Sequence, residues 1–168
     1  MSFQRILIAV DSEPIAVHAA DLGLELAGLL GAQVAFIHVV DPQLNFAPES
    51  GIPADELIAR AVEDGKRLLA GFRERIKAQL QCLEFLEVAK PANAIVDAAK
   101  RWPADVIVIG SHGRGGLPRA MLGSVADAVM RHAPCPVLVV KGKGVRLRDR
   151  LPNSAASETE IDVRPAFP

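Results

Sequence analysis

The sequence predicts an α/β fold: a doubly wound, five-stranded parallel sheet with helices on both faces, in the Rossmann-like manner. Short apolar runs of strand length alternate along the chain with longer segments whose apolar residues recur at helical spacing. These runs are nearly unbroken, which is typical of parallel strands buried on both faces. Late in the chain, one such run breaks into a glycine-rich loop and resumes as a helix. That arrangement is a common way to present backbone N–H groups to an anionic ligand.

The composition indicates one compact domain. Of the 168 residues, 50% are hydrophobic and 23% are charged, and the formal net charge is −1. A chain of this size buries a sizeable core without dividing, and its charge suggests no nucleic-acid or membrane partner. No apolar run is long enough to cross a bilayer, and the chain begins with a strand rather than a signal peptide. Cys82 and Cys135 are too few for a disulfide framework or a zinc site, so we expect a cytoplasmic protein.

The first strand and helix flank a short polar turn. Residues 5–10 form the first apolar run, which ends at Asp11 and Ser12. Pro14 suits the first turn of a helix, and Asp11 or Ser12 is the expected cap. Gly31 follows the last apolar residue of this helix and is expected to stop it.

The rest of the chain continues the alternation of strands and helices. Strands are expected at residues 33–40, 83–89, 106–109 and 137–140, and helices at residues 54–80, 91–102 and 124–132. The connection over residues 43–53 is loop-like, because it is rich in proline, glycine and small polar residues.

The order of strands decides where a ligand would bind. In the order 3-2-1-4-5, the first and fourth strands are neighbours where the winding reverses, and a crevice opens at their carboxyl ends. The chain places Asp11 at one of these ends and Gly110 at the other. In the alternative order 2-1-3-4-5, the fourth strand would not lie beside the first, and this convergence would weaken.

The glycine-rich loop has a specific spacing. Five glycines occur in residues 110–123. A Walker A loop does not fit because no lysine precedes Ser124, and in G-x-G-x-x-G the third glycine would fall on Pro118. What fits is Gly110, two residues, Gly113, nine residues, and then Gly123 and Ser124.

This pattern resembles the ATP-binding members of the universal stress protein family, which carry G-x2-G-x9-G-[S/T]. The resemblance covers about residues 1–141, and it leaves residues 142–168 as a C-terminal tail. It implies a site for ATP or another adenine nucleotide in which Asp11 faces the nucleotide and the backbone of Val39 contacts adenine. The residues implied in phosphate or ribose contact are Gly110, Gly113, Gly123, Ser124 and Val125. Weaker candidates for nucleotide contact are Ala9, Ser12, His112, Arg114 and Arg119.

Several of these residues have a plainer explanation. Asp11 could be only a helix cap, and Ser124 could be an N-cap, a phosphate ligand or both, because a bound phosphate uses the donors that a cap would satisfy. An arginine such as Arg114 is by default solvated. Val39 could be only a core valine. His38 lies in the middle of a strand and is expected to be a hydrogen-bonded core residue.

The expected function is that of an ATP-binding universal stress protein, a dimeric cytoplasmic regulator of the stress response. The sequence carries no H-E-x-x-H and no G-x-S-x-G motif, so ATP binding with little or no hydrolysis is expected. Two alternatives stay open. One is a slow ATPase or phosphotransferase that uses Asp11 with Mg²⁺ or Mn²⁺. The other is an interaction module without nucleotide, in which the glycines serve only the turn.

The last strand and the tail raise separate expectations. Val137–Val140 would lie at the edge of the sheet, where an uncovered apolar strand favours a homodimer through this edge. The family resemblance points the same way. The tail is basic at first and acidic later, has no apolar period, and is expected to be mobile. Alternatively, Val145 and Leu147 extend the edge or fold over the partner subunit.

Overall fold

The computed structural model describes residues 3–43, 51–76, 80–111 and 122–141, and five strands alternate with four helices in them. In chain order these are β1 (Arg5–Ala9), α1 (Pro14–Leu30), β2 (Gln33–Val40), α2 (Ala54–Arg73), β3 (Cys82–Val88), α3 (Pro91–Arg101), β4 (Val106–Gly110), α4 (Ser124–His132) and β5 (Val137–Val140). Within these residues, no helix combines the length and hydrophobicity needed to cross a bilayer.

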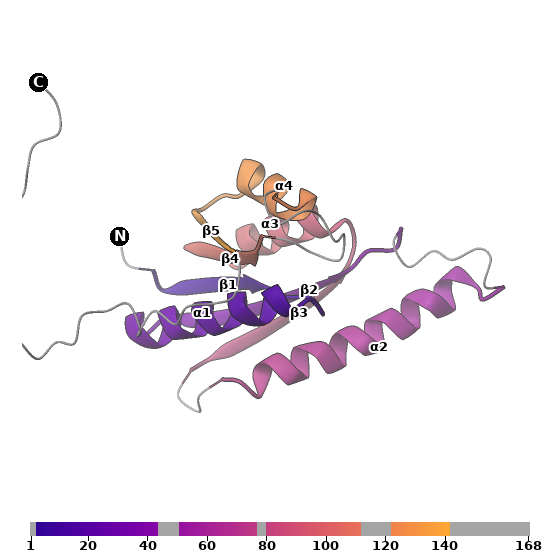
Figure 1. The fold of residues 1–168 in the computed structure, drawn as a ribbon, viewed down its shortest axis with the longest axis horizontal. Helices are drawn as coiled ribbons and strands as arrows, with labels where there is room; N and C mark the ends of the chain where they lie inside the picture. The colour runs from indigo at the N-terminus through magenta and orange to yellow at the C-terminus, as the bar shows by residue number, and fades with distance from the viewer. Residues whose placement is uncertain (1–2, 44–50, 77–79, 112–121, 142–168) are drawn as a thin grey trace, which may run out of the picture.

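The five strands form one parallel sheet in the order β3-β2-β1-β4-β5, which confirms the predicted topology (Figure 1). β1 lies between β2 and β4, and its pairing ends with Ala9 opposite Ile37 on one side and Ile109 on the other. The order fits the right-handed crossover that each parallel strand–helix–strand unit prefers. The carboxyl ends of β1 and β4 are therefore direct neighbours.

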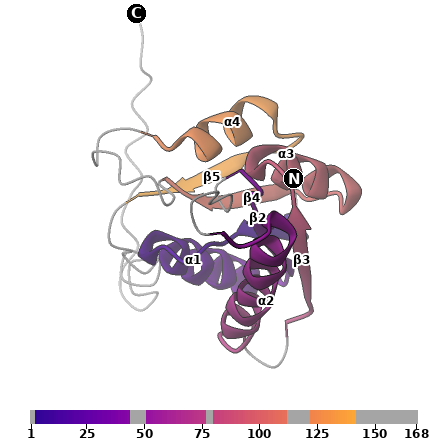
Figure 2. The ribbon, with the colours of Figure 1, turned by 90° about the vertical axis from the view of Figure 1, so that its right-hand side faces the viewer.

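Each face of the sheet is buried under two helices, so the molecule has three layers (Figure 2). Alternate residues of the central strands, such as Ile8 and Phe36, pack toward α1 and α2. The residues between them, such as Leu7 and Ile37, pack toward α3 and α4. The side chains of Ile6, Leu7 and Ile8 have no exposed surface, which is expected of a strand covered on both faces.

The helix boundaries differ from the sequence prediction by more than one residue at one place. The helix expected over residues 54–80 ends at Arg73, with Glu74 as its C-cap. The amides of Arg75 and Ile76 instead donate to carbonyls three residues back, at 3.1 and 3.0 Å, so the last turn tightens before the chain leaves the helix. α1 ends as predicted, with Gly31 in the left-handed conformation at a φ of 65°.

Candidate functional site

The structure brings the predicted polar ends of β1 and β4 together. The amide of Val10 donates to the carbonyl of Ile37 at 2.9 Å, which continues the β1–β2 pairing one residue beyond the strand. Asp11 then turns away toward α1. On the other side, Gly110 is the last residue of β4 and lies opposite Val140 of β5. Asp11 and Gly110 thus lie at the same edge of the sheet, at the point where its winding reverses.

The two ends of the glycine-rich segment are held to each other. The amide of Ser111 donates to the carbonyl of Val140 at 2.8 Å, and the amide of Gly123 donates to the carbonyl of Ser111 at 2.7 Å. Ser111 and Gly123 are both buried. These two hydrogen bonds place the start of α4 directly beside the end of β4. The central part of the loop, with His112, Gly113, Arg114 and Arg119, lies outside the described residues.

The start of α4 differs in one detail from the sequence interpretation. The N-cap is Gly123, with φ −63° and ψ 148°, and Ser124 is the first residue of the helix. The interpretation of Ser124 as the N-cap is therefore wrong. Gly123 has no side chain to accept a hydrogen bond from the first turn. The amides of Ser124 and Val125 have no acceptor inside the helix, and no hydrogen bond joins them to another of the described residues, so they suit an external anion.

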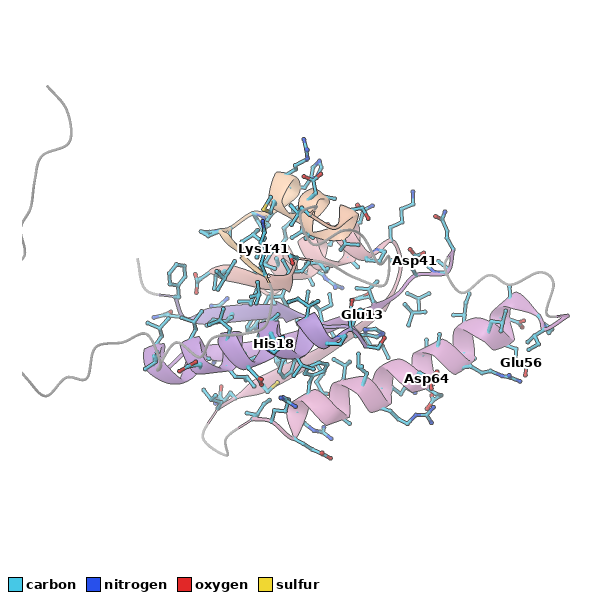
Figure 3. All side chains as sticks on the ribbon, viewed as in Figure 1. Glu13, His18, Asp41, Glu56, Asp64 and Lys141 are labelled. Atoms are coloured by element: carbon cyan, nitrogen blue, oxygen red, sulfur yellow. The ribbon has the colours of Figure 1, made fainter. Side chains whose placement is uncertain are left out.

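Asp11 organises the turn between β1 and α1. Its Oδ1 accepts a hydrogen bond from the amide of Glu13 at 2.9 Å, and Glu13, rather than Asp11 or Ser12, is the N-cap of α1. The carboxylate is half-buried, whereas Ser12 is exposed. In Figure 3, Glu13 and Asp41 lie toward the same end of the molecule, as expected because β1 and β2 are parallel.

Ala9 and Val39 belong to the layer that contains α3 and α4. Both pack against the apolar cluster of that layer, Ala9 buried and Val39 half-buried. Val39 pairs with Glu87 of β3 and lies two residues beyond Ile37, where the pairing of β1 with β2 ends. Its backbone is therefore at the carboxyl edge of the sheet, on the far side of β1 from Gly110.

Two residues at this edge were not among the predicted site residues. Ser111 has no exposed surface, and only its place as the first polar residue after β4 could have indicated it. His38 is 6% exposed, and its ring Nδ1 lies 2.9 Å from the carbonyl oxygen of Val10. The sequence predicted His38 as a hydrogen-bonded core residue, which is confirmed, but its partner could be found only from the fold.

The described residues contain no group of three or more His, Cys, Asp or Glu side chains that could hold a metal ion. A carboxylate such as that of Asp11 suits a hard divalent cation, but a single carboxylate supplies only part of its ligand set. We therefore assign no metal ligand among the described residues.

The fold and these features define a class: a doubly wound α/β protein whose polar turns and one helix amino terminus gather at the topological switch point. Within that class, the model of the universal stress protein family matches residues 2–141. The chain belongs to the universal stress protein family.

Individual relatives agree with this assignment over most of their length. Universal stress protein MJ0531 of Methanocaldococcus jannaschii is 36% identical over 148 residues, which cover 83% of this chain and 82% of that protein. The solved structure of the protein MJ0577 has a TM-score of 0.75 and 27% identity, covering 86% of this chain and all (100%) of that one. A universal stress protein from Archaeoglobus fulgidus, solved in complex with dAMP, has a TM-score of 0.59 and 30% identity, covering 84% and 100%.

Proposed function

We propose that this chain binds an adenine nucleotide, ATP, in the crevice between the ends of β1 and β4, and that it acts as a dimeric cytoplasmic regulator of the stress response. One observation carries the proposal most directly. The amino terminus of α4 is fastened beside the end of β4 through the 2.7 Å hydrogen bond between Gly123 and Ser111. First-turn amides that have no acceptor within the helix, together with a favourable dipole at a switch point, suit a phosphate group.

The proposed roles follow the family resemblance and, for the described residues, agree with their positions at the carboxyl edge of the sheet. The amides of Ser124 and Val125 donate to the phosphates. The glycines at positions 110, 113 and 123 let the backbone approach phosphate or ribose, because no Cβ intervenes. Asp11 faces the nucleotide from the end of β1, and the backbone of Val39 contacts adenine. Ala9, Ser12, His112 and Arg114 are secondary candidates.

The A. fulgidus relative supports the class of ligand. That protein was solved with dAMP bound, and it is 30% identical to this chain. An adenine nucleotide is therefore the first ligand to test. The preference for a triphosphate rests on the G-x2-G-x9-G-S spacing of Gly110, Gly113, Gly123 and Ser124.

The test has two parts. Mass spectrometry of small molecules released from the purified, acid-denatured chain identifies a ligand that the protein carries with it. Isothermal titration calorimetry of the ligand-free chain with ATP, ADP and dAMP then measures affinity. We expect binding of ATP in the micromolar range or tighter, about −8 kcal/mol or below. A chain that releases no adenine nucleotide and binds none of the three contradicts the proposal and favours the interaction module.

The regulatory part of the proposal concerns the surface that partners meet. Nucleotide binding would order the loop over residues 110–124 and shift the population of conformations that the dimer presents. For such regulation, the partner must bind the nucleotide-bound form and the nucleotide-free form of the protein with different affinities. The dimer itself is proposed to form through Val137–Val140.

A further inference from the structure

His38 is a buried polar side chain between β1 and α2. It lies in β2 opposite Leu86 of β3 and is 6% exposed. Its Nδ1 is 2.9 Å from the carbonyl oxygen of Val10. A carbonyl oxygen only accepts hydrogen bonds, so Nδ1 carries the proton and donates it.

The carbonyl that His38 holds belongs to the peptide bond that joins Val10 to Asp11. The amide of Val10 is bound to the carbonyl of Ile37 at 2.9 Å, and its carbonyl is bound to His38. Both polar groups of Val10 are therefore fixed by β2. Because a peptide unit is planar, fixing its carbonyl also fixes the direction of the Asp11 amide and the start of the Asp11 residue.

The outer edge of the imidazole faces α2. A Cβ added to Gly65 of α2 would lie 2.8 Å from Cδ2 of His38 and 2.8 Å from Cδ1 of Leu86. Gly65 is buried. The helix thus approaches the imidazole so closely that only a glycine fits, and the ring is held between α2 on one side and Val10 on the other.

We propose that His38 is a positioning residue for the nucleotide site, and that through it the placement of Asp11 depends on the placement of α2. This inference rests on the proposed function, because Asp11 is taken to face the nucleotide. A shift of α2 moves the imidazole, and the imidazole carries the Val10–Asp11 peptide with it. Nucleotide binding at Asp11 then favours the position of α2 seen here.

The first test replaces the imidazole. His38→Leu introduces an apolar side chain of similar bulk and leaves the buried carbonyl of Val10 without its donor. His38→Asn retains an N–H group near the place of Nδ1. By calorimetry with ATP and with dAMP, well below the melting temperature, we expect affinity about tenfold weaker in His38→Leu and within about threefold of wild type in His38→Asn.

The second test leaves every proposed site residue unchanged. Gly65→Ala should displace the imidazole and weaken nucleotide binding, as His38→Leu does. Gly71→Ala, in the same helix, is the matched control, because a Cβ there meets no atom within 4 Å. We expect Gly71→Ala to leave affinity unchanged.

A purely structural role predicts a different pattern. Asp105→Ala removes the carboxylate that accepts from the amides of Gln4 and Arg5 at 2.8 and 2.9 Å, at the opposite end of the sheet. It should lower the melting temperature without changing affinity. If His38→Leu and Gly65→Ala do the same, lowering the melting temperature and leaving affinity at the wild-type value, the positioning role is overturned.

A ligand-free measurement separates this inference from the proposed function. In amide NMR spectra of the empty protein, His38→Leu and Gly65→Ala should both shift the Asp11 resonance, and Gly71→Ala should not. If these shifts appear but the wild type binds neither ATP nor dAMP, the proposed function fails although the link between α2 and Asp11 stands. If the Asp11 resonance stays in place in both variants, the link itself is contradicted.

Discussion

Both cysteines lie in half-buried positions that keep their thiols protonated. Burial, with a smaller contribution from the nearby carboxylate of Glu84, raises the pKa of Cys82 from 9.0 to about 11. Burial also raises the pKa of Cys135, with a smaller contribution from Asp105. A thiol is a poor nucleophile until it ionises. We expect alkylation by iodoacetamide near neutral pH, followed by mass spectrometry, to be slow in the folded chain at both cysteines and fast after unfolding in urea.

Because the pKa of Cys82 is raised in the folded chain, its contribution to the free energy of unfolding falls as the pH rises. The unfolded thiol ionises near its ordinary value of 9.0 and the folded one near 11, so between these values the unfolded state binds fewer protons. The contribution of Cys82 is therefore fully present below pH 9 and is lost as the pH rises through 11.

Comparison with Cys82→Ser isolates this effect, because other groups titrate alike in both chains. Trp102 is the single tryptophan and packs edge-on against Phe85 with ring centroids 6.4 Å apart, so its fluorescence reports unfolding. In urea titrations the wild type should lose more stability than Cys82→Ser between about pH 8 and about pH 10.5. An equal loss in the two chains would contradict the raised pKa.

At the scale of elements, α1 packs tightly on the sheet at one glycine. A Cβ on Gly23 would lie 2.5 Å from Cδ1 and 2.9 Å from Cγ1 of Ile8, whose side chain is fully buried. Gly23→Ala should therefore lower the free energy of unfolding by about 1–3 kcal/mol. Gly28→Ala, in the same helix, meets no atom within 4 Å and should raise it by about 0.5–1 kcal/mol. Urea unfolding measures both changes in the free energy of unfolding. If the two substitutions change it in the same direction, this packing is contradicted.

The amino terminus of α4 allows stability and binding to be separated. Ser124 is the exposed first residue of the helix. Ser124→Asp adds a negative charge there, which should stabilise the helix by about 0.3–1 kcal/mol through its dipole. The same charge repels a phosphate and should weaken ATP binding about tenfold or more. Ser124→Asn is the neutral control, and calorimetry and thermal melting read the two effects. If ATP binds Ser124→Asp as tightly as it binds the wild type, the phosphates do not bind at this end of the helix.

The elements were predictable where a local signal decides them. The spacing of apolar residues, with Pro14, Gly31 and Gly123 marking helix ends, predicted helices and strands whose bounds the structure largely repeats. The end of α2 was missed because its apolar spacing continues past Arg73, whereas the chain leaves the helix through tightened turns. The partner of His38 was missed for another reason. The hydrogen bond to Val10 joins residues 28 apart in sequence, so it exists only once the strands are placed side by side.

For the whole molecule, the two edges of the sheet differ in a way that bears on assembly. The edge strand β3 carries Glu84 and Glu87, which pair with Arg73 at 3.5 Å and Arg101 at 2.5 Å. Such exposed ion pairs add little stability, but charged side chains discourage another strand from pairing. The other edge strand, β5, consists of Val137, Leu138, Val139 and Val140. Pairing with a second copy is therefore favoured at β5 and opposed at β3.

The hydrogen bonds of β5 show which amides a partner could use. The carbonyl oxygen of Pro136 accepts a hydrogen bond from the amide of Ile107 at 3.0 Å. The carbonyl oxygen of Val140 accepts one from the amide of Ser111, the residue after β4, at 2.8 Å. Along a strand, the backbone N–H and C=O groups of alternate residues point to opposite neighbours. Because Pro136 and Val140 face β4, the amides of Val137 and Val139 point away from it, to the outer edge of the sheet. Val139→Pro removes one outward N–H without removing a bond to β4, whereas Val139→Thr keeps it.

If the dimer forms through this edge, Val139→Pro should weaken it and Val139→Thr should not. Sedimentation equilibrium at micromolar concentrations should show a dimer for wild type and Val139→Thr and a shift toward monomer for Val139→Pro. Because the added proline ring restricts φ near one edge residue, circular dichroism must show that the variant keeps its fold. A wild-type chain that is monomeric at these concentrations contradicts the dimer. A folded Val139→Pro chain that dimerises like wild type places the interface elsewhere, because an edge that lost a donor could not pair equally well.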